Sequence, residues 1–472
     1  MSSAPFDLAR ALGRVAELAA SRSTAPLGRI AAPEDVATAI DVAIGHAGVS
    51  FEQLLGSLEA VVGCSVNTAS PLFHNQLFSG FNPPAFLGDV VASLLNTTMA
   101  TWEASPAATC IELHLLERLS RLAGLTDGDG TFTSGGSESN LQAMLVARNL
   151  AFPAIRADGR WPSTPLVVLM SEHAHYSVRS AAQALGIGNR HVVPVPVDSD
   201  GAMRADALAA AVGSCRAEGR EPFFVCATAG TSLLGAVDPI DQLADVAVRE
   251  RLWLHVDGCL GASALLAPAR RRLLHGIERV DSLAWDAHKL MGVPVSCSVL
   301  LMKRRGELEA TCAPEGAEYL FHDATAGPDL GRRSLRCARR AGALTLWTAW
   351  KLIGEAGYES RTERLFALAE SAGAAVDATP GLVRVAPVST VSVCFRVAAP
   401  SGVDGDWLTR AVRERLREQG RAFLNHGPFG GRTILRLVVS NPDVTEDDLW
   451  SIVAAVGQAR DAVLSGMAQE TM

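Results

Sequence analysis

The 472-residue sequence lacks several features that assign a chain to a common protein class. No run of eighteen apolar residues occurs, so nothing predicts a membrane-spanning helix. The first twenty residues lack the basic, apolar and small-residue order of a signal peptide and resemble an amphipathic helix. The nine cysteines are scattered without metal-ligand spacing, so we expect no metal site and a reducing, cytoplasmic environment.

An excess of basic charge and the common nucleotide-binding motifs are also missing. The net charge of -8 argues against nucleic acid or an anionic membrane as a partner. No Gly-Lys-Ser/Thr motif follows the Gly-Gly turn at 135–136, and no G-x-G-x-x-G opens a helix there, which argues against ATP and NAD. The composition, 48% hydrophobic and 19% charged, is that of a globular chain with a large core and two or three domains.

Two segments indicate covalent cofactor chemistry. Lys289, in Asp-Ala-His-Lys, lies thirty-two positions (289 minus 257) after Asp257, which ends the apolar stretch Trp-Leu-His-Val-Asp. A buried lysine that loses its proton can form a Schiff base with an aldehyde, and a buried aspartate can keep a pyridine nitrogen protonated. Each residue alone has a plain structural explanation, a surface lysine and a strand-end carboxylate. Together they predict a pyridoxal phosphate (PLP) site.

Three further segments agree with this prediction. The stretch 131–148 passes from a strand through a Gly-Gly turn into a helix, which leaves the amides of Gly136, Ser137 and Glu138 free to bind phosphate or merely to be capped. Ser-Glu-His-Ala-His-Tyr-Ser at 171–177 places His175 after an apolar strand, where an imidazole can stack on a flat ring. The segment 226–240 places the hydroxyl of Thr231 at the same sheet edge. The alternative is that this hydroxyl only closes an ordinary turn.

The order of apolar stretches predicts an α/β fold in three parts. Residues 1–60 are expected to form helices. Strand and helix patterns alternate over 61–340, for example strands at 223–228, 253–257 and 281–286 and a helix at 240–252, which predicts a mostly parallel sheet covered by helices on both faces. Residues 341–472 are expected to form a small α+β domain, with helices at 343–354 and 407–419 and a strand at 433–440.

In these motifs the chain resembles the group II PLP-dependent amino-acid decarboxylases, most of all those acting on glutamate and cysteine sulfinate. The resemblance covers about four fifths of the chain, from Phe-His-Asn-Gln-Leu-Phe-Ser-Gly at 73–80 to Arg-Leu-Val-Val-Ser-Asn at 436–441. It implies PLP fold type I, with a large domain, a small C-terminal domain and an N-terminal helical segment. It also implies a homodimer in which residues 1–60 pack on the partner subunit. The substrate would be a small amino acid.

The resemblance also implies roles for individual residues. Lys289 would carry the cofactor, Asp257 would hold the pyridine nitrogen, and His175 would stack on the ring. Gly136, Ser137 and His288 would bind the phosphate, with Glu138 and Asp286 nearby and Thr231 beside the cofactor. Gln76 and Arg436 would grip the acidic side chain of the substrate, because the planar arginine fork suits a carboxylate or sulfinate.

The sequence departs from the family pattern in several places. Gly258 and Cys259 follow Asp257 where two alanines are usual, His74 replaces an aromatic residue, and Trp102 stands where tyrosine is usual. The stretch 322–335, which corresponds to the mobile catalytic loop, is shorter by about three residues and contains no tyrosine. In the family a tyrosine of this loop is the residue assigned to donate the proton that the α-carbon takes up after decarboxylation. His322 is therefore the candidate donor in this chain, with His175 and Lys289 as alternatives.

These departures leave three functional hypotheses. The first is α-decarboxylation of a free acidic amino acid such as glutamate, aspartate or cysteine sulfinate. In the second, the same reaction acts on an aminoacyl group tethered to a carrier protein, because a short loop would leave the site open. The third is a non-catalytic PLP-binding relative, against which the presence of Lys289 and Asp257 argues.

Overall fold

The computed structural model describes residues 6–22, 24–28, 31–322 and 327–470, and these divide into two compact units. One unit consists of Asn82–Glu370 and Ala386–Val393, and the other of Met1–Phe81, Ser371–Val385 and Cys394–Met472. The N-terminal helices thus belong to the same unit as the C-terminal α+β region. The sequence-based boundaries at residues 60 and 340 stay a prediction.

The first unit is built on a seven-stranded sheet with the order β2-β8-β7-β6-β5-β3-β4. Strands β3 to β7 pair in parallel with one another, and β8 pairs antiparallel with both β7 and β2. Every residue of the central strands β3, β6 and β7 is buried except Trp253, which explains their continuous apolar sequences. The strands are β2 (Asp129–Thr133), β3 (Leu166–Ser171), β4 (Val192–Val195), β5 (Glu221–Thr228), β6 (Trp253–Asp257), β7 (Ser282–Asp286) and β8 (Ser298–Met302).

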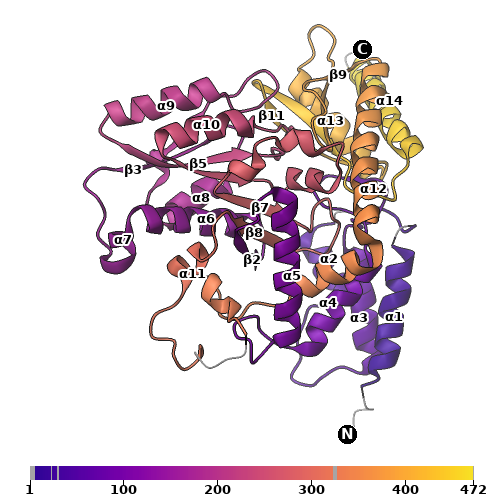
Figure 1. The fold of residues 1–472 in the computed structure, drawn as a ribbon. Helices are drawn as coiled ribbons and strands as arrows, with labels where there is room; N and C mark the ends of the chain where they lie inside the picture. The colour runs from indigo at the N-terminus through magenta and orange to yellow at the C-terminus, as the bar shows by residue number, and fades with distance from the viewer. Residues whose placement is uncertain (1–5, 23, 29–30, 323–326, 471–472) are drawn as a thin grey trace. The chain divides into compact units, whose positions relative to one another are not determined.

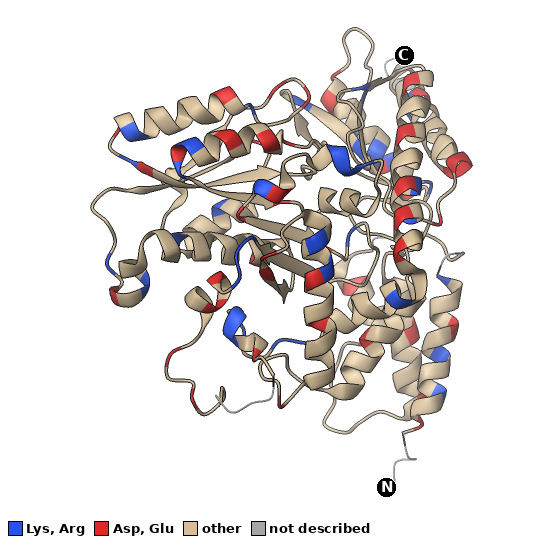
Figure 2. Cartoon of the chain, in the orientation of Figure 1, with Lys and Arg blue, Asp and Glu red and all other residues tan. Residues whose placement is uncertain are grey.

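Helices cover this sheet on both faces. Figure 1 shows α9 and α10 on one side of β3 and β5, and α6 and α8 on the other. Charged residues lie mainly on the helices and loops, with both signs interspersed (Figure 2). The helices of this unit are α4 (Pro83–Leu95), α5 (Pro106–Ala123), α6 (Gly136–Ala151), α7 (Pro153–Asp158), α8 (Ser177–Ala184), α9 (Ala205–Ala217), α10 (Ile240–Glu250) and α11 (Glu307–Cys312).

The long helix α12 (Ala343–Ala378) contains a break that the sequence anticipates. The predicted helix ends at Gly354, and Gly354 has a left-handed φ of 72° inside α12. Glycine adopts this conformation without the steric cost that a Cβ would add, so the helical direction changes there. The prediction missed only the continuation beyond the kink.

The second unit combines helices with a five-stranded sheet of order β1-β11-β12-β10-β9. Strand β1 runs parallel to β11, whereas β11 pairs antiparallel with β12 and β10 with β9. The strands are β1 (Phe73–His74), β9 (Leu382–Arg384), β10 (Ser392–Val397), β11 (Phe423–Phe429) and β12 (Arg432–Val438). The helices are α1 (Leu8–Ser21), α2 (Pro33–Ile40), α3 (Phe51–Cys64), α13 (Gly405–Glu418) and α14 (Glu446–Glu470).

The predicted fold class is confirmed. Strand β6 has the bounds expected from the sequence, and β5, β7 and α10 differ by two residues or fewer at each end. Among the residues that the structure describes, no helix is both long and apolar enough to cross a bilayer.

Candidate active site

The carboxyl ends of the parallel strands bring the predicted catalytic residues to one edge of the seven-stranded sheet. Asp257 is the last residue of β6, and it pairs in register with Thr228 at the end of β5. Asp286 ends β7, and Lys289 follows it by three residues. Strand β3 ends at Ser171, shortly before His175. This edge is where open α/β sheets bind their ligands.

Lys289 lies in a largely buried ion pair. Its Nζ is 3.1 Å from Asp286 Oδ2, and only 18% of its side chain is exposed. Burial lowers the pKa of the amine, but the negative charges of Asp286 and Asp257 outweigh it and hold the pKa above its usual value. In the cofactor-free site the amine therefore holds its proton near pH 7, and the Schiff-base role of Lys289 stays a prediction.

Asp257 is buried and held as an anion. Burial raises the pKa of its carboxyl, yet the charge of Lys289 and the hydrogen bond from Asn140 bring it below the usual range. Asn140 Nδ2 donates to Asp257 Oδ2 over 2.8 Å, and the backbone amide of Cys259 donates to Oδ1 over 3.2 Å. An ionised carboxylate of this kind can hold a pyridine nitrogen in its protonated form.

Asn140 is a site residue that the sequence-based prediction missed. It is fully buried on α6, four residues after Gly136, and it also bonds to Ser177 and His255. The signal available in the sequence was a polar residue on the buried face of a helix. Its partners come from β6 and α8, far along the chain, so the contacts themselves could not be foreseen.

His175 lies half-buried at the start of α8. Its Nδ1 is 2.8 Å from Ser177 Oγ, and its ring centroid is 4.2 Å from that of Tyr176. Burial lowers the pKa of His175, with smaller opposing contributions from the nearby carboxylates. The imidazole is therefore neutral near pH 7, as a ring-stacking residue can be.

The turn before α6 has the backbone of a phosphate site with one difference from the prediction. Gly136 begins the helix, and a Cβ added there would overlap Cys259 Sγ, so only glycine fits beside this thiol. The amide of Glu138 is not free, because it donates to Gly135 O over 3.0 Å. Glu138 Oε2 accepts from the amide of Ser134 over 2.7 Å and so stabilises the turn. Ser137 is exposed at the helix start.

Asp286 and His288 are linked to β8. Ser298 Oγ donates to Asp286 Oδ1 over 2.5 Å, and His288 Nε2 lies 3.6 Å from Asp286 Oδ2. His288 Nδ1 faces the backbone of Cys297, whose carbonyl oxygen is 2.9 Å away. Burial lowers the pKa of His288. These contacts fix both side chains before any ligand binds.

Two threonines differ in how their hydroxyls are used. Thr231 Oγ1 accepts from the amide of Ala236 over 3.1 Å and closes a turn, which is the ordinary role considered for it. Thr228 Oγ1 is buried and has no hydrogen-bond partner within the described part of the chain. A buried hydroxyl without a partner costs free energy, so a ligand at this edge that bonds to Thr228 would recover it.

Gln76 and Arg436 lie in the other unit, where Asn75 joins them. Arg436 is buried on β12 and its Nη2 donates to Asn75 O over 2.6 Å, while Gln76 Nε2 donates to Asn75 Oδ1 over 2.8 Å. Burial lowers the pKa of Arg436. His74, which replaces an aromatic residue of the family pattern, is buried with its ring nitrogens 2.8 Å from the carbonyls of Val438 and Pro71.

His322 is exposed at the beginning of the short loop. Its Nδ1 lies 3.9 Å from Glu103 Oε2, and 51% of its side chain is exposed. Residues 323–326, which belong to the predicted catalytic loop, lie outside the described residues. Beyond them, a Cβ on Gly327 would overlap the indole of Trp102, so this part of the loop lies against the segment that carries Glu103.

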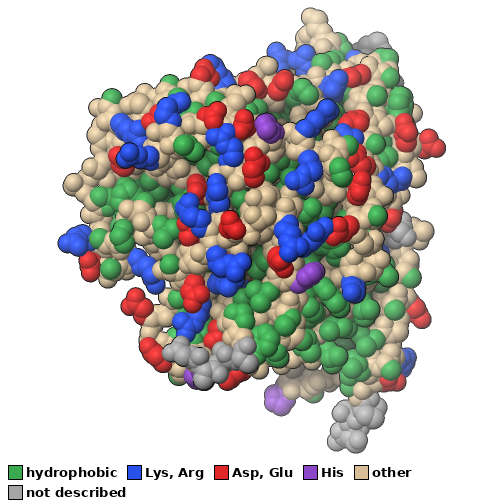
Figure 3. Space-filling model, viewed as in Figure 1, with side chains coloured by type: hydrophobic (Ala, Val, Ile, Leu, Met, Phe, Trp, Pro, Cys, Tyr) green, Lys and Arg blue, Asp and Glu red, His purple; other side chains and the backbone are tan. Residues whose placement is uncertain are grey.

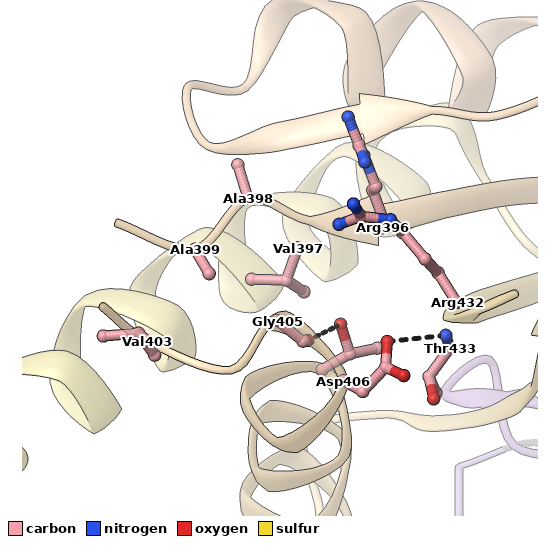
Figure 4. A pocket seen from close by; sticks show the side chains of 10 residues that line it. Arg396, Val397, Ala398, Ala399, Val403, Gly405, Asp406, Arg432 and Thr433 are labelled. Carbon is pink, nitrogen blue, oxygen red and sulfur yellow. Dashed lines mark hydrogen bonds between the residues drawn. The ribbon is translucent and has the colours of Figure 1, made fainter. Parts of the chain in front are cut away.

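One cavity borders the turn before α6, and another lies away from the predicted site residues. One, of about 230 Å³, is lined by Thr133 and Ser134 of the turn before α6, by Cys297 and by Arg336. Another, of about 380 Å³, lies among β10, β12 and α13 in the other unit, where Figure 4 shows Arg396 and Arg432 above Asp406. Asp406 accepts from the amide of Thr433 over 2.8 Å. None of the predicted site residues lines this second cavity.

The residues at the sheet edge fit PLP. The buried anion of Asp257 matches a pyridinium, Lys289 supplies an amine, and Thr228 offers an unused hydroxyl. The glycine turn at α6 lets the backbone approach a phosphate.

Comparisons with known proteins agree with this chemistry. The pyridoxal-dependent decarboxylase conserved domain matches residues 33–398. Cysteine sulfinic acid decarboxylase of Rattus norvegicus is 36% identical over 431 residues, covering 88% of this chain and 87% of that protein. Acidic amino acid decarboxylase GADL1 of Mus musculus is 35% identical, covering 88% and 78%.

Solved structures agree as well. Mouse CSAD in its apo form superposes with a TM-score of 0.91 at 32% identity, covering 96% of this chain and 98% of that one. Oryza sativa TDC with PLP and tryptamine gives a TM-score of 0.90 at 27% identity, covering 98% and 100%. The chain therefore belongs to the pyridoxal-dependent decarboxylase family and is a PLP-dependent amino-acid decarboxylase.

Proposed function

We propose that the enzyme removes the α-carboxyl group of a free acidic L-amino acid, such as glutamate, aspartate or cysteine sulfinate, and releases the corresponding amine. The observation that carries this proposal is Arg436, a buried guanidinium in a family whose 35–36% identical relatives act on cysteine sulfinate and other acidic amino acids. A buried guanidinium suits an anionic ligand, and the bond from its Nη2 to Asn75 O, over 2.6 Å, holds the side chain beside Gln76 and Asn75.

The cofactor would be held by residues of the seven-stranded sheet. Lys289 would carry it covalently, Asp257 would bind its ring nitrogen and His175 would stack on its face. The phosphate would lie at the start of α6, against Gly136 and Ser137, with His288, Glu138, Asp286 and Thr231 around the group. Bound there, PLP supplies the electron sink that accepts the electrons left when carbon dioxide departs.

Each protein group has a separate task in the reaction. Asp257, as an anion, keeps the positive charge on the ring nitrogen. Lys289 must give up the proton that Asp286 now helps to hold, so that its amine becomes nucleophilic. Arg436 and Gln76 orient the acidic side chain of the substrate. Such positioning lowers the entropic part of the barrier.

A proton must then reach the α-carbon. We propose His322 for this task, because it begins the short loop and a histidine can act as a general acid where the family has a tyrosine. Lys289 and His175 are the alternatives.

The proposal includes a homodimer. Helix α4 exposes Leu87, Val91, Leu94 and Leu95, which share one helical face, and Figure 3 shows hydrophobic side chains gathered there. An apolar stripe of this kind is typical of a surface that a second subunit covers. Leu94→Glu should convert the dimer to a monomer in light scattering, whereas Val248→Glu, at an exposed apolar residue on α10, should not. A monomeric wild type would refute the proposal.

We also propose that the enzyme works in the cytoplasm, a reducing environment, because all nine cysteines are free.

Measuring carbon dioxide release from free amino acids tests the substrate proposal directly. We expect release from glutamate, aspartate or cysteine sulfinate and little from aromatic amino acids. The same assay with aspartyl and glutamyl groups on a carrier protein tests the alternative that the short loop suggests. Release only from carrier-linked groups would replace the free-substrate proposal, and release from neither would support a non-catalytic relative.

A further inference from the structure

A continuous set of buried hydrogen bonds lies behind the cofactor edge. Trp253 Nε1 donates to Ser282 Oγ over 2.9 Å, and Ser282 Oγ is 2.8 Å from His255 Nδ1. His255 Nε2 is 2.9 Å from Asn140 Oδ1. Asn140 Nδ2 then bonds to both Asp257 Oδ2 and Ser177 Oγ, over 2.8 and 2.9 Å.

The direction of each bond follows from which atoms can donate. A carboxylate only accepts, so the Asn140 atom that faces Asp257 is its NH₂ group, and Oδ1 faces His255. An amide oxygen only accepts, so His255 carries a proton on Nε2. His255 is neutral, because burial lowers its pKa to about 4. Its Nδ1 is then an acceptor, and Ser282 donates to it.

The same reasoning extends to His175. The two amide hydrogens of Asn140 go to Asp257 and Ser177, so Ser177 Oγ accepts one of them and has its own hydrogen to give. That hydrogen points to His175 Nδ1, 2.8 Å away. The backbone amide of Ser177 also donates to this Nδ1, over 3.3 Å. Two donors therefore converge on Nδ1, and the ring proton of neutral His175 lies on Nε2.

We propose that Asn140 is a positioning residue that sets two groups at once: it keeps Asp257 as an anion and fixes His175 in the Nε2–H tautomer. The side chain of Asn140 is the single branching point of these bonds. Both effects depend on the amide having one acceptor and two donor hydrogens in this orientation.

This arrangement limits what His175 can do, a consequence that rests on the proposed function. A neutral Nε2–H imidazole can donate a hydrogen bond to a ligand. To act as a proton donor it would have to become an imidazolate, whose formation is strongly unfavourable near pH 7. His175 is then an orienting residue, and the proton for the α-carbon comes from His322 or Lys289.

The ¹⁵N spectrum of the histidine side chains tests the proposal on the full-length protein without substrate. The eleven histidines are labelled, and the signals of His175 are identified by their loss in His175→Gln. We expect wild-type His175 to carry its proton on Nε2, both without PLP and with PLP bound. A proton on Nδ1 in the wild type would overturn the proposal.

The nearly isosteric variant Asn140→Asp reverses the polarity of the branching point. Its carboxylate would accept from Ser177 Oγ–H, so Ser177 would accept from His175 and the proton would move to Nδ1. It would also repel Asp257, and we expect the Kd for PLP to rise about 10-fold or more, the scale of losing a bond to a charged group. Asn149→Asp, also at a buried asparagine on α6, should change neither the tautomer nor the Kd.

Asn140→Ala is the second variant, to be used if the additional buried carboxylate of Asn140→Asp prevents folding. It removes the donors and the acceptor together, and we expect a mixture of His175 tautomers and the same weakening of PLP binding. An unchanged tautomer and an unchanged Kd in the folded Asn140 variants would contradict the proposal. These readouts involve no turnover, so a failure of the substrate assignment would leave them unaffected.

Discussion

The edge of the seven-stranded sheet and the segment around His322 differ in how firmly their side chains are held. Lys289 and Asp257 lie in a buried network of ion pairs and hydrogen bonds. His322 is half exposed and has a carboxylate at 3.9 Å, a contact that solvent weakens. The groups proposed to hold the cofactor are thus fixed by the core, whereas the proposed proton donor lies on an exposed loop. Substitutions at the sheet edge should therefore cost more than substitutions at the loop.

The largest effect is expected at Lys289. Lys289→Ala would remove the proposed covalent attachment of the cofactor, and kcat should fall by roughly 10⁴-fold or more, the scale of losing a covalent catalytic group. The control is Lys303→Ala, at a lysine whose Nζ donates to Arg279 O over 3.0 Å. That variant should keep its turnover. Substantial activity in Lys289→Ala would contradict the role of the sheet edge.

The second-largest loss of kcat is expected at Asp257. Asp257→Ala would remove the anion proposed to keep the ring nitrogen protonated, and we expect kcat to fall about 10²- to 10³-fold or more while phosphate contacts retain some PLP. Asp257→Asn has a similar shape without the charge and should lose a comparable factor. If Asp257→Asn kept wild-type kcat, charge at this position would not be what matters.

An intermediate effect is expected at Arg436. Arg436→Met should raise KM for a free acidic amino acid and cost about 2–5 kcal/mol in kcat/KM, as for one partner of a buried charge pair. With a carrier-linked substrate that lacks the free carboxylate, the penalty should be smaller. Arg396→Met, on the neighbouring strand β10, is the matched control and should leave KM unchanged. A fully active Arg436→Met enzyme on all three free substrates would exclude the proposed role.

The smallest effect is expected at His322. His322→Phe should lower kcat by about 10²-fold, the scale of a positioned general acid, and divert part of the product toward an aldehyde. His275 offers a control, since it is also exposed and lies 3.7 Å from a carboxylate, that of Asp241. Product analysis distinguishes the cases, because His275→Phe should give the amine alone. Unchanged kcat and only amine from His322→Phe would transfer the role to Lys289.

The sequence predicted the strands better than the environments of the side chains. A buried parallel strand appears in the sequence as a run of apolar residues, and at a ligand-binding edge a polar residue ends the run. The positions of β6 and Asp257 could therefore be predicted from the sequence. The protonated state of Lys289 could not, because it depends on how burial balances against two carboxylates in space. Asn140 was missed because its partners lie 37 and more than 100 residues away.

The departures after Asp257 became understandable only in the structure. A Cβ at Gly258 would lie 2.7 Å from Leu283 Cδ1 and 3.0 Å from Ala284 O, so the usual alanine would need its neighbours to shift. Cys259 Sγ in turn occupies the space beside Gly136. Neither contact could be foreseen from one sequence, because each joins segments that the sheet brings together.

Borohydride reduction of the PLP-loaded enzyme followed by peptide mass spectrometry tests the central claim most directly. The chain contains three lysines, Lys289, Lys303 and Lys351, so the other two serve as internal controls. The account predicts a pyridoxyl group fixed on Lys289 with the other two unmodified, and no fixed label in Lys289→Ala. A label on Lys303 or Lys351, with Lys289 unmodified, would contradict it.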